Sequence, residues 1–340
     1  MDGHKGRLLR RPLIVVLLNL ALAAAYYGTA QIGLMIGLAH GHISPFWPPT
    51  GVAIVALLVL GSELWPGILL GAGVGNVFTG PVITAVPTAA GTTLACLCAY
   101  WGLRKANFRI ELDRLKDALA LVFLAAFGAM LISSTLGTMQ LLLTGVVSGH
   151  SFVPTWLTWW TGDAMGVLIV APLLLTLINI PWRQYRYVDS GRFTEIALLL
   201  VGSFGIMVFG EQGLGVSFLA FPLLVLAAWR FQLPGAAPVS LLLSAVAIHA
   251  AVHGTGTFAG HDQLHTMVIL QAFNGSIALT GLLLSVAITE RNRTRVELER
   301  TCARLGEVIE HIDRAMRPDR AASPLRHWAE EKQATPKGRG

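Results

Sequence analysis

The sequence predicts an all-α protein, a polytopic bundle of about eight to ten helical membrane segments followed by a short cytoplasmic helix. First, 54% of the 340 residues are hydrophobic and only 13% are charged, whereas soluble domains carry about 25% charged residues. Second, many of the apolar runs approach the ~20 residues that a helix needs to cross a bilayer. Third, Lys and Arg gather in a few linkers between these runs, as they do in cytoplasmic loops.

The chain divides into four parts. Residues 1–12 are a basic N-terminus, 13–290 a membrane domain, 291–317 a juxtamembrane helix, and 318–340 a polar tail that we expect to be disordered. The first apolar run is too long for a cleaved signal peptide, so we expect it to remain as a span. The expected membrane segments are, in chain order, 13–39, 50–61, 64–80, 82–103, 117–145, 156–180, 193–210, 218–231, 235–253 and 264–289.

The distribution of charge decides the count of segments. With ten passes, all 25 Lys and Arg lie on one side of the membrane, together with both termini. If 50–80 were a single span, Arg104 and Lys105 would move outside, and if 218–253 were one span, the basic cluster at 291–295 would. Each short stretch must therefore form a hairpin or pair of short helices, shielded by protein where its backbone is irregular. The basic residues lie in the linkers between the membrane segments. The net charge of +6 therefore does not predict nucleic-acid binding.

The segment that begins at Trp156 is the one around which the other segments are predicted to pack. Tryptophans in its first turns, Trp159 and Trp160 among them, suit the lipid–water interface. Asp163 follows in an otherwise apolar run, where an acid costs roughly 2.5–3.5 kcal/mol and is functional by default. Gly162 and Gly166 are four residues apart, which predicts close approach of a neighbouring helix.

A polar pocket is predicted in the outer half of the bundle, where most polar side chains of the apolar segments fall. The candidate ligand-binding residues are Asp163, Trp159, Trp160, Trp47, Thr50, Asn76, Gln140, His249 and Asn274. No Lys or Arg falls there, so we expect His, Asn or Thr beside Asp163, or a proton on its carboxyl group. The alternative is that each polar group satisfies one interhelical hydrogen bond, worth about 0.6 kcal/mol on average.

Histidines form two pairs with a spacing of four, His249 with His253 and His261 with His265. Such pairs can ligate a metal or haem, but they also occur as interfacial polar residues, and Asp262 is the single acid at matching spacing. The sequence therefore predicts no cofactor and no metal. It also predicts no catalytic residue, because no nucleophile or second carboxylate accompanies the acid of the central segment.

The juxtamembrane helix 291–317 carries an apolar seam with alternating spacings of four and three, which is typical of a coiled coil. The seam consists of Leu298, Cys302, Leu305, Ile309, Ile312 and Met316. It predicts a possible homodimer through this helix. The alternative is an amphipathic helix that lies on acidic membrane lipid through its arginines.

Several short motifs follow one another along the chain. They are Trp47-Pro48-Pro49-Thr50-Gly51, Leu64-Trp65-Pro66-Gly67, Gly75-Asn76, Ser134-Thr135-Leu136-Gly137, Trp159-Trp160-Thr161-Gly162-Asp163-Ala164 with Gly166-Val167-Leu168, Ala171-Pro172, Phe221-Pro222 and Trp229-Arg230-Phe231. As an ordered set, they resemble the membrane-associated sensor family known as MASE type 1, over roughly residues 13–290.

That resemblance implies a multi-pass sensory domain of the bacterial inner membrane with both termini in the cytoplasm. In the family it usually precedes a histidine kinase, a diguanylate cyclase or a phosphodiesterase, as in two-component and cyclic-di-GMP signalling. No kinase or cyclase motif is recognisable after residue 290, so a separate cytoplasmic kinase or cyclase is the expected partner. The expected function is to sense a periplasmic or membrane-borne cue, an unknown small ligand, and to pass the signal on. The alternative is a small-molecule or ion transporter, which would also need polar groups in the nearly bare inner half.

Overall fold

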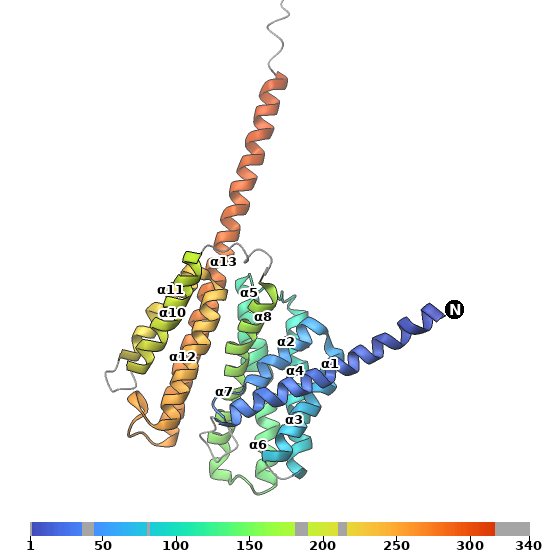
Figure 1. The fold of residues 1–340 in the computed structure, drawn as a ribbon, viewed down its shortest axis with the longest axis vertical. Coiled ribbons are helices and arrows are strands. Elements are labelled where there is room, and N and C mark those ends of the chain that lie inside the picture. The colour runs from blue at the N-terminus through green and yellow to red at the C-terminus, as the bar shows by residue number, and fades with distance from the viewer. Residues whose placement is uncertain (1, 36–43, 80–81, 181–189, 210–215, 317–340) are drawn as a thin grey trace, which may run out of the picture. The chain divides into compact units, whose positions relative to one another are not determined.

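The computed structural model describes residues 2–35, 44–79, 82–180, 190–209 and 216–316, and every regular element in these ranges is a helix (Figure 1). The first half comprises α1 (Asp2–Met35), α2 (Pro48–Leu60), η1 (Ser62–Leu64), α3 (Trp65–Thr79), α4 (Val82–Lys105), α5 (Leu115–Ala120), η2 (Leu121–Ala129) and α6 (Met130–Leu143). The second half comprises η3 (Gly149–Ser151), α7 (Phe152–Met165), η4 (Gly166–Val170), α8 (Ala171–Asn179), α10 (Ser190–Phe209), η6 (Val216–Leu219), α11 (Ala220–Phe231), α12 (Leu233–His253), η7 (Gly256–Phe258) and α13 (Gln263–Met316). The predicted all-α class is confirmed.

Six of these helical segments are long and apolar enough to cross a membrane, which makes the chain a multi-pass membrane protein. They are Pro12–Met35, Ile83–Lys105, Leu115–Leu143, Gly149–Asn179, Leu233–His253 and Leu264–Asp313. Shorter apolar helices lie at Pro48–Leu60, Thr194–Phe209 and Ala220–Phe231. The first and the last of these coincide with stretches that the charge argument required to be short, whereas the stretch 235–253 belongs to a helix that is long enough to cross a membrane. The count of ten passes stays a prediction.

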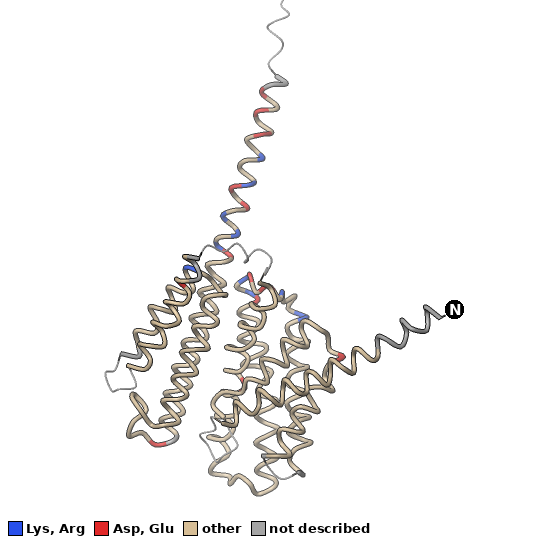
Figure 2. The backbone as a smooth tube through the Cα atoms, viewed as in Figure 1, with Lys and Arg blue, Asp and Glu red and all other residues tan. Residues whose placement is uncertain are grey.

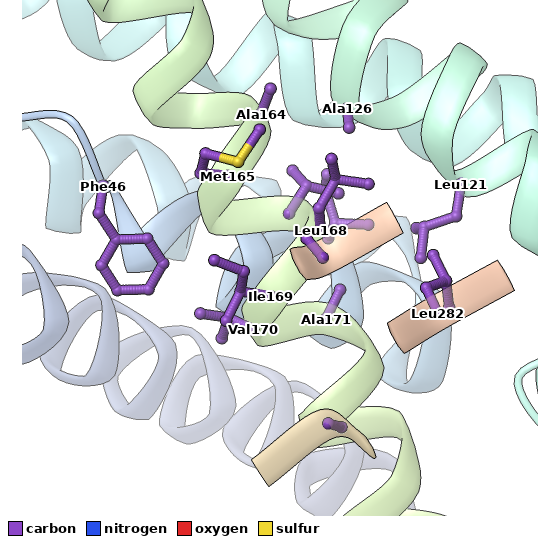
Figure 3. Close-up of a cluster of buried hydrophobic side chains, with 14 of the residues drawn as sticks. Phe46, Leu121, Ala126, Ala164, Met165, Leu168, Ile169, Val170, Ala171 and Leu282 are labelled. Carbon is purple, nitrogen blue, oxygen red and sulfur yellow. The ribbon is translucent and has the colours of Figure 1, made fainter. Parts of the chain in front are cut away.

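The segment from α7 through η4 to α8 is the most buried of the six. Its middle, η4, contacts α2 on one side and α12 on another. Figure 3 shows Leu168 of η4 in one buried cluster with Leu121 of η2, Leu282 of α13 and Phe46 of the segment before α2. Residues from widely separated parts of the sequence therefore meet on this segment.

Two membrane segments contain a stretch of π-helix, η2 and η4. A π-helical turn leaves a backbone group without its usual helical partner, and such stretches often mark functional sites. The backbone carbonyl of Phe127, in η2, accepts a hydrogen bond from the indole N–H of Trp160, in α7, at 2.9 Å. The two π-helical stretches thus lie close to the Trp-Trp-x-Gly-Asp motif, one bonded to it and the other following it directly.

Basic residues of the bundle gather at one end of its helices, as the coloured backbone in Figure 2 shows. Five of them lie between the last turn of α4 and the first turn of α5. There, Arg114 makes a two-pronged ion pair with the buried Asp117, at 2.7 and 2.9 Å. Arg230, at the end of α11, pairs with Glu195 of α10 at 2.9 Å. This one-sided distribution supports the proposed orientation, in which that end faces the cytoplasm.

The orientation predicts which single cysteines a membrane-impermeant thiol reagent reaches in intact cells. Cysteines introduced at Gly149 and Ala259 should label from outside, and one at Ala106 only after permeabilisation, in a background in which Cys96, Cys98 and Cys302 are replaced by serine. The positions of the introduced cysteines are exposed and avoid the positive φ of Asn107 and Gly260. Labelling at Ala106 in intact cells would contradict the ten-pass arrangement.

Contacts divide the chain into two units, 1–290 and 291–340. In the second unit, the described part of α13 is held by ion pairs one turn apart, Arg293 with Glu297 at 3.2 Å and Arg295 with Glu299 at 3.1 Å. The seam residues from Leu298 to Ile312 are exposed, with Leu298 at 61% and Ile309 at 66%. Removing such a row of apolar side chains from water, by covering it with another surface, is favourable in free energy. The tail 318–340, predicted to be disordered, lies outside the described residues.

Candidate functional site

A polar cavity of about 50 Å³ lies next to Asp163, between α1, α3, α4, α7 and the segment that precedes α2. Four of the predicted ligand-binding residues line it, namely Asp163, Trp159, Trp47 and Asn76. The other lining residues are Tyr26, Ala30, Leu34, Ser44, Ala72, Gly75, Thr88 and Thr92. The cavity therefore combines one carboxyl group, three aromatic rings and several neutral polar groups.

The segment from Ser44 to Gly51 packs directly against the two glycines of the Trp-Trp-x-Gly-Asp block. The Trp47 N–H donates to the Gly162 carbonyl at 3.0 Å. A methyl group on Gly166 would overlap the Trp47 carbonyl, and one on Gly162 would overlap that of Ser44. The predicted close approach is thus made by a loop and the first turn of α2, whose entry Pro48 and Pro49 hold in place.

Asp163 is almost fully buried, with 1% of its surface exposed. The side chains of Ser133 and Trp159 lie next to its carboxylate, while its Oδ2 atom has no hydrogen-bond partner among the described residues. No ion pair to Asp163 occurs in the part of the chain that the structure describes. In place of the expected His, Asn or Thr, the described residues beside the carboxylate are a serine from α6 and a tryptophan from the preceding turn. The other expectation, a proton on the carboxyl group, stays a prediction.

A chain of polar side chains extends from Asp163 across the cavity wall. Ser133 lies 3.4 Å from the Thr92 hydroxyl of α4. Across the cavity, the Trp47 indole N–H donates to the Tyr26 hydroxyl of α1 at 3.4 Å. Sequence reasoning missed Tyr26 and Thr92, although threonines spaced by four along α4, Thr88 and Thr92, are a signal that could have indicated a polar face.

Three more predicted residues lie beside the cavity without lining it. The Thr50 hydroxyl donates to the backbone carbonyl of Asp163 at 3.1 Å. Gln140 accepts a hydrogen bond from Thr88 at 3.2 Å. Trp160 stacks on Trp156, with ring centroids 5.8 Å apart. These three residues stabilise the walls of the cavity.

His249 and Asn274 do not join the cavity. His249 is exposed near the end of α12, with its ring 4.1 Å from that of His253. Asn274 is fully buried in α13, and neither of its side-chain polar atoms has a partner among the described residues. No cluster of three His, Cys, Asp or Glu residues that could hold a metal occurs within the described ranges.

A larger cavity of about 210 Å³ lies between α10, α11, α12 and α13. Its lining is almost entirely apolar, and its residues are Met207, Phe218, Phe221, Ala247, Ala250, Gly256, Thr257, Phe258, Ile269 and Phe273. A ligand pocket normally includes a few convergent polar groups that fix the orientation of the ligand. The smaller cavity has such groups and includes the buried acid, so it is the better candidate site.

Helix α13 contacts the wall of the smaller cavity and the opposite end of the bundle. The Gln271 side-chain amide donates to the Pro45 carbonyl at 2.8 Å, within the segment that carries Ser44 and Trp47. Near the end of its membrane part, Glu290 accepts a hydrogen bond from the Leu115 backbone N–H at 2.8 Å. One helix thus joins the cavity wall to the start of α5 at the end where the basic residues gather.

Comparison with known proteins identifies the family of this chain. No curated protein and no solved structure matches the chain. The family model MASE1 matches residues 17–292, which contain the cavity, the central segment and the membrane part of α13. The match covers well over half of the sequence, and the chain therefore belongs to the MASE1 family of membrane sensory domains.

Proposed function

We propose that this protein binds a small polar solute in the Asp163 cavity from the outer side of a bacterial inner membrane and passes the signal to a cytoplasmic partner. The observation that carries the proposal is the buried Oδ2 atom of Asp163, which has no hydrogen-bond partner among the described residues although it belongs to a cavity-lining side chain. Leaving a buried acceptor unpaired costs about 1–3 kcal/mol, and more for a charged group. A ligand that supplies the missing partner offsets this cost.

The route for the signal follows the hydrogen bonds between the cavity and α13. A ligand that contacts Trp47 or Ser44 acts on the segment whose Pro45 carbonyl is bonded to Gln271. A shift of this segment biases α13, and the contact between Glu290 and Leu115 couples α13 to α5 near the membrane exit. Packed interfaces of this kind change between discrete arrangements and can thus amplify small shifts.

The juxtamembrane helix is the proposed output element. Its exposed seam suits a parallel homodimer, which would present two copies of the helix to a separate histidine kinase or diguanylate cyclase. In this proposal both termini lie in the cytoplasm, and the chain takes part in two-component or cyclic-di-GMP signalling without catalysis of its own. An interfacial helix on acidic lipid is the alternative for the same seam.

Asp163→Asn tests the role of the cavity, because it keeps the volume of the side chain but removes the charge and replaces one acceptor oxygen by an NH₂ donor. In a fusion of residues 1–316 to a diguanylate cyclase domain, the wild-type sequence should change cyclic-di-GMP levels between media of different solutes. We expect the variant to insert and fold normally and to lose this difference. Cyclic-di-GMP is measured per folded fusion.

The matched control is Asp262→Asn, an exposed acid outside the cavity whose pKa is lowered by hydrogen bonds from His265. It should leave the difference between media intact. If Asp163→Asn instead abolished folding while its residual folded fraction still responded, Asp163 would be a structural residue. A response that survives in fully folded Asp163→Asn would place the sensing site elsewhere.

A further inference from the structure

The chemistry of the cavity walls narrows the class of ligand. Asp163 contributes a carboxylate, and the described lining residues include no Lys, Arg or His. Among these residues an anion would meet a like charge and no basic group, which is unfavourable in a desolvated site. A neutral solute would leave the buried carboxylate without a counter-charge, whereas a cation would compensate it.

Aromatic rings account for much of the remaining wall. Trp47, Trp159 and Tyr26 come from three different parts of the chain and meet around the same small volume. The faces of such rings attract ammonium groups within about 6 Å, and rings that surround a cation are a known solution for methylated amines.

The cavity also offers hydrogen-bond acceptors to the N–H groups of an ammonium ion. An ammonium group has up to three N–H donors. The unpaired Oδ2 of Asp163 is one acceptor, and the hydroxyl groups of Ser44, Thr88 and Thr92 add oxygen atoms to the lining. The site therefore offers both a charge and directional acceptors to a donor-rich cation.

The volume limits the size of the ligand. One water molecule occupies roughly 10–15 Å³ of such a cavity, so about 50 Å³ takes on the order of four water-sized groups. Ammonium, methylammonium or the head group of a slightly longer amine fits this space. A polyaromatic or sugar ligand exceeds it.

We propose that the Asp163 cavity binds a small organic ammonium cation, held by the Asp163 carboxylate and surrounded by Trp47, Trp159 and Tyr26. This inference rests on the proposed function, since it names the class of solute that the sensory site takes. It also explains why a buried acid has neither a basic partner nor a complete set of hydrogen bonds within the described chain.

The test uses the purified full chain in lipid nanodiscs and methylammonium chloride as the probe. Thermal unfolding is followed while the probe is added, with sodium chloride at the same ionic strength as the reference. We expect a saturable rise in the unfolding temperature with methylammonium and none with sodium. Asp163→Asn should raise the half-saturating concentration at least about tenfold, since loss of a buried charge partner is costly. Asp262→Asn should leave it unchanged.

A second measurement does not depend on the folding of any variant. A hydrophobic carbodiimide reacts with carboxyl groups inside membrane proteins, and mass spectrometry of the wild type reports modification at Asp163. Methylammonium should slow this reaction, and sodium should not. Equal protection by both salts would replace the inference with an alkali-cation site, and protection by neither would overturn it.

The failure of this inference can be told apart from the failure of the proposed function. If Asp163→Asn abolished the response of the cyclase fusion but methylammonium neither bound nor protected, only the ligand class would be wrong. If methylammonium bound and the fusion with Asp163→Asn kept its full response, the cation site would stand and the sensory role would fall.

Discussion

Replacing Gly166 by alanine is expected to prevent most of the chain from reaching the folded state. Its added methyl group would overlap the Trp47 carbonyl and press on the Thr50 hydroxyl. Overpacking costs typically about 1–3 kcal/mol when side chains can shift. Here the clash is with backbone that also donates the hydrogen bond to Gly162, so we expect a loss at or above the upper end of that range.

The measurement is the yield and the unfolding temperature of the purified protein. Gly205→Ala is the matched control, because Gly205 lies inside α10 with no atom within 4 Å of the added methyl group. There, alanine gains up to about 1 kcal/mol of helix propensity, so the control should be neutral or slightly more stable. If Gly166→Ala folded as well as the control, the packing of Ser44–Gly51 on this helix would be less close than described.

The second large effect is expected from a change of register in the juxtamembrane helix. Deleting four residues, Thr294–Glu297, rotates the seam that follows by about 40° and shortens the helix by about 6 Å. Deleting the seven residues Val296–Cys302 nearly preserves the phase of the seam. In the cyclase fusion, the four-residue deletion should lock or invert the output, and the seven-residue deletion should largely retain it.

The physical reason is that a rigid helix transmits rotation only if its seam keeps the orientation that the bundle sets. Cyclic-di-GMP per folded fusion is again the measurement, with membrane insertion checked for each variant. The seven-residue deletion is the control for shortening, since it removes more residues than the other. Equal output from both deletions would contradict a signalling role for the juxtamembrane helix and favour a transporter, which has no need of this register.

Much of the fold follows from local features of the sequence. A membrane segment is defined by the composition of about 20 neighbouring residues, which is why the apolar runs agree with the helices that the structure describes. Asp163 and the pair Gly162 and Gly166 stood out in the same way, since an acid or two spaced glycines in an apolar run are unusual whatever surrounds them. Basic linkers similarly indicated which ends of the helices lie together.

What only the tertiary structure decided is which residues meet. Inside a membrane, apolar surfaces gain little from choosing one helix over another, so the pairing depends on detailed packing and not on hydrophobic periodicity. The sequence could therefore not indicate that Ser133 would lie beside Asp163, or that Tyr26 and Thr92 would line its cavity. Trp159 is different, because it precedes Asp163 by one turn of the same helix.

The same reason explains the two predicted site residues that lie elsewhere. His249 and Asn274 are polar groups in apolar helices, as Asp163 is, and depth in the membrane alone cannot separate them from it. The fold places His249 on an exposed face and buries Asn274 away from the cavity. The fold also directs Gln271 to the Pro45 carbonyl, a contact over 226 positions of sequence that no local pattern encodes and that joins the cavity wall to the output helix.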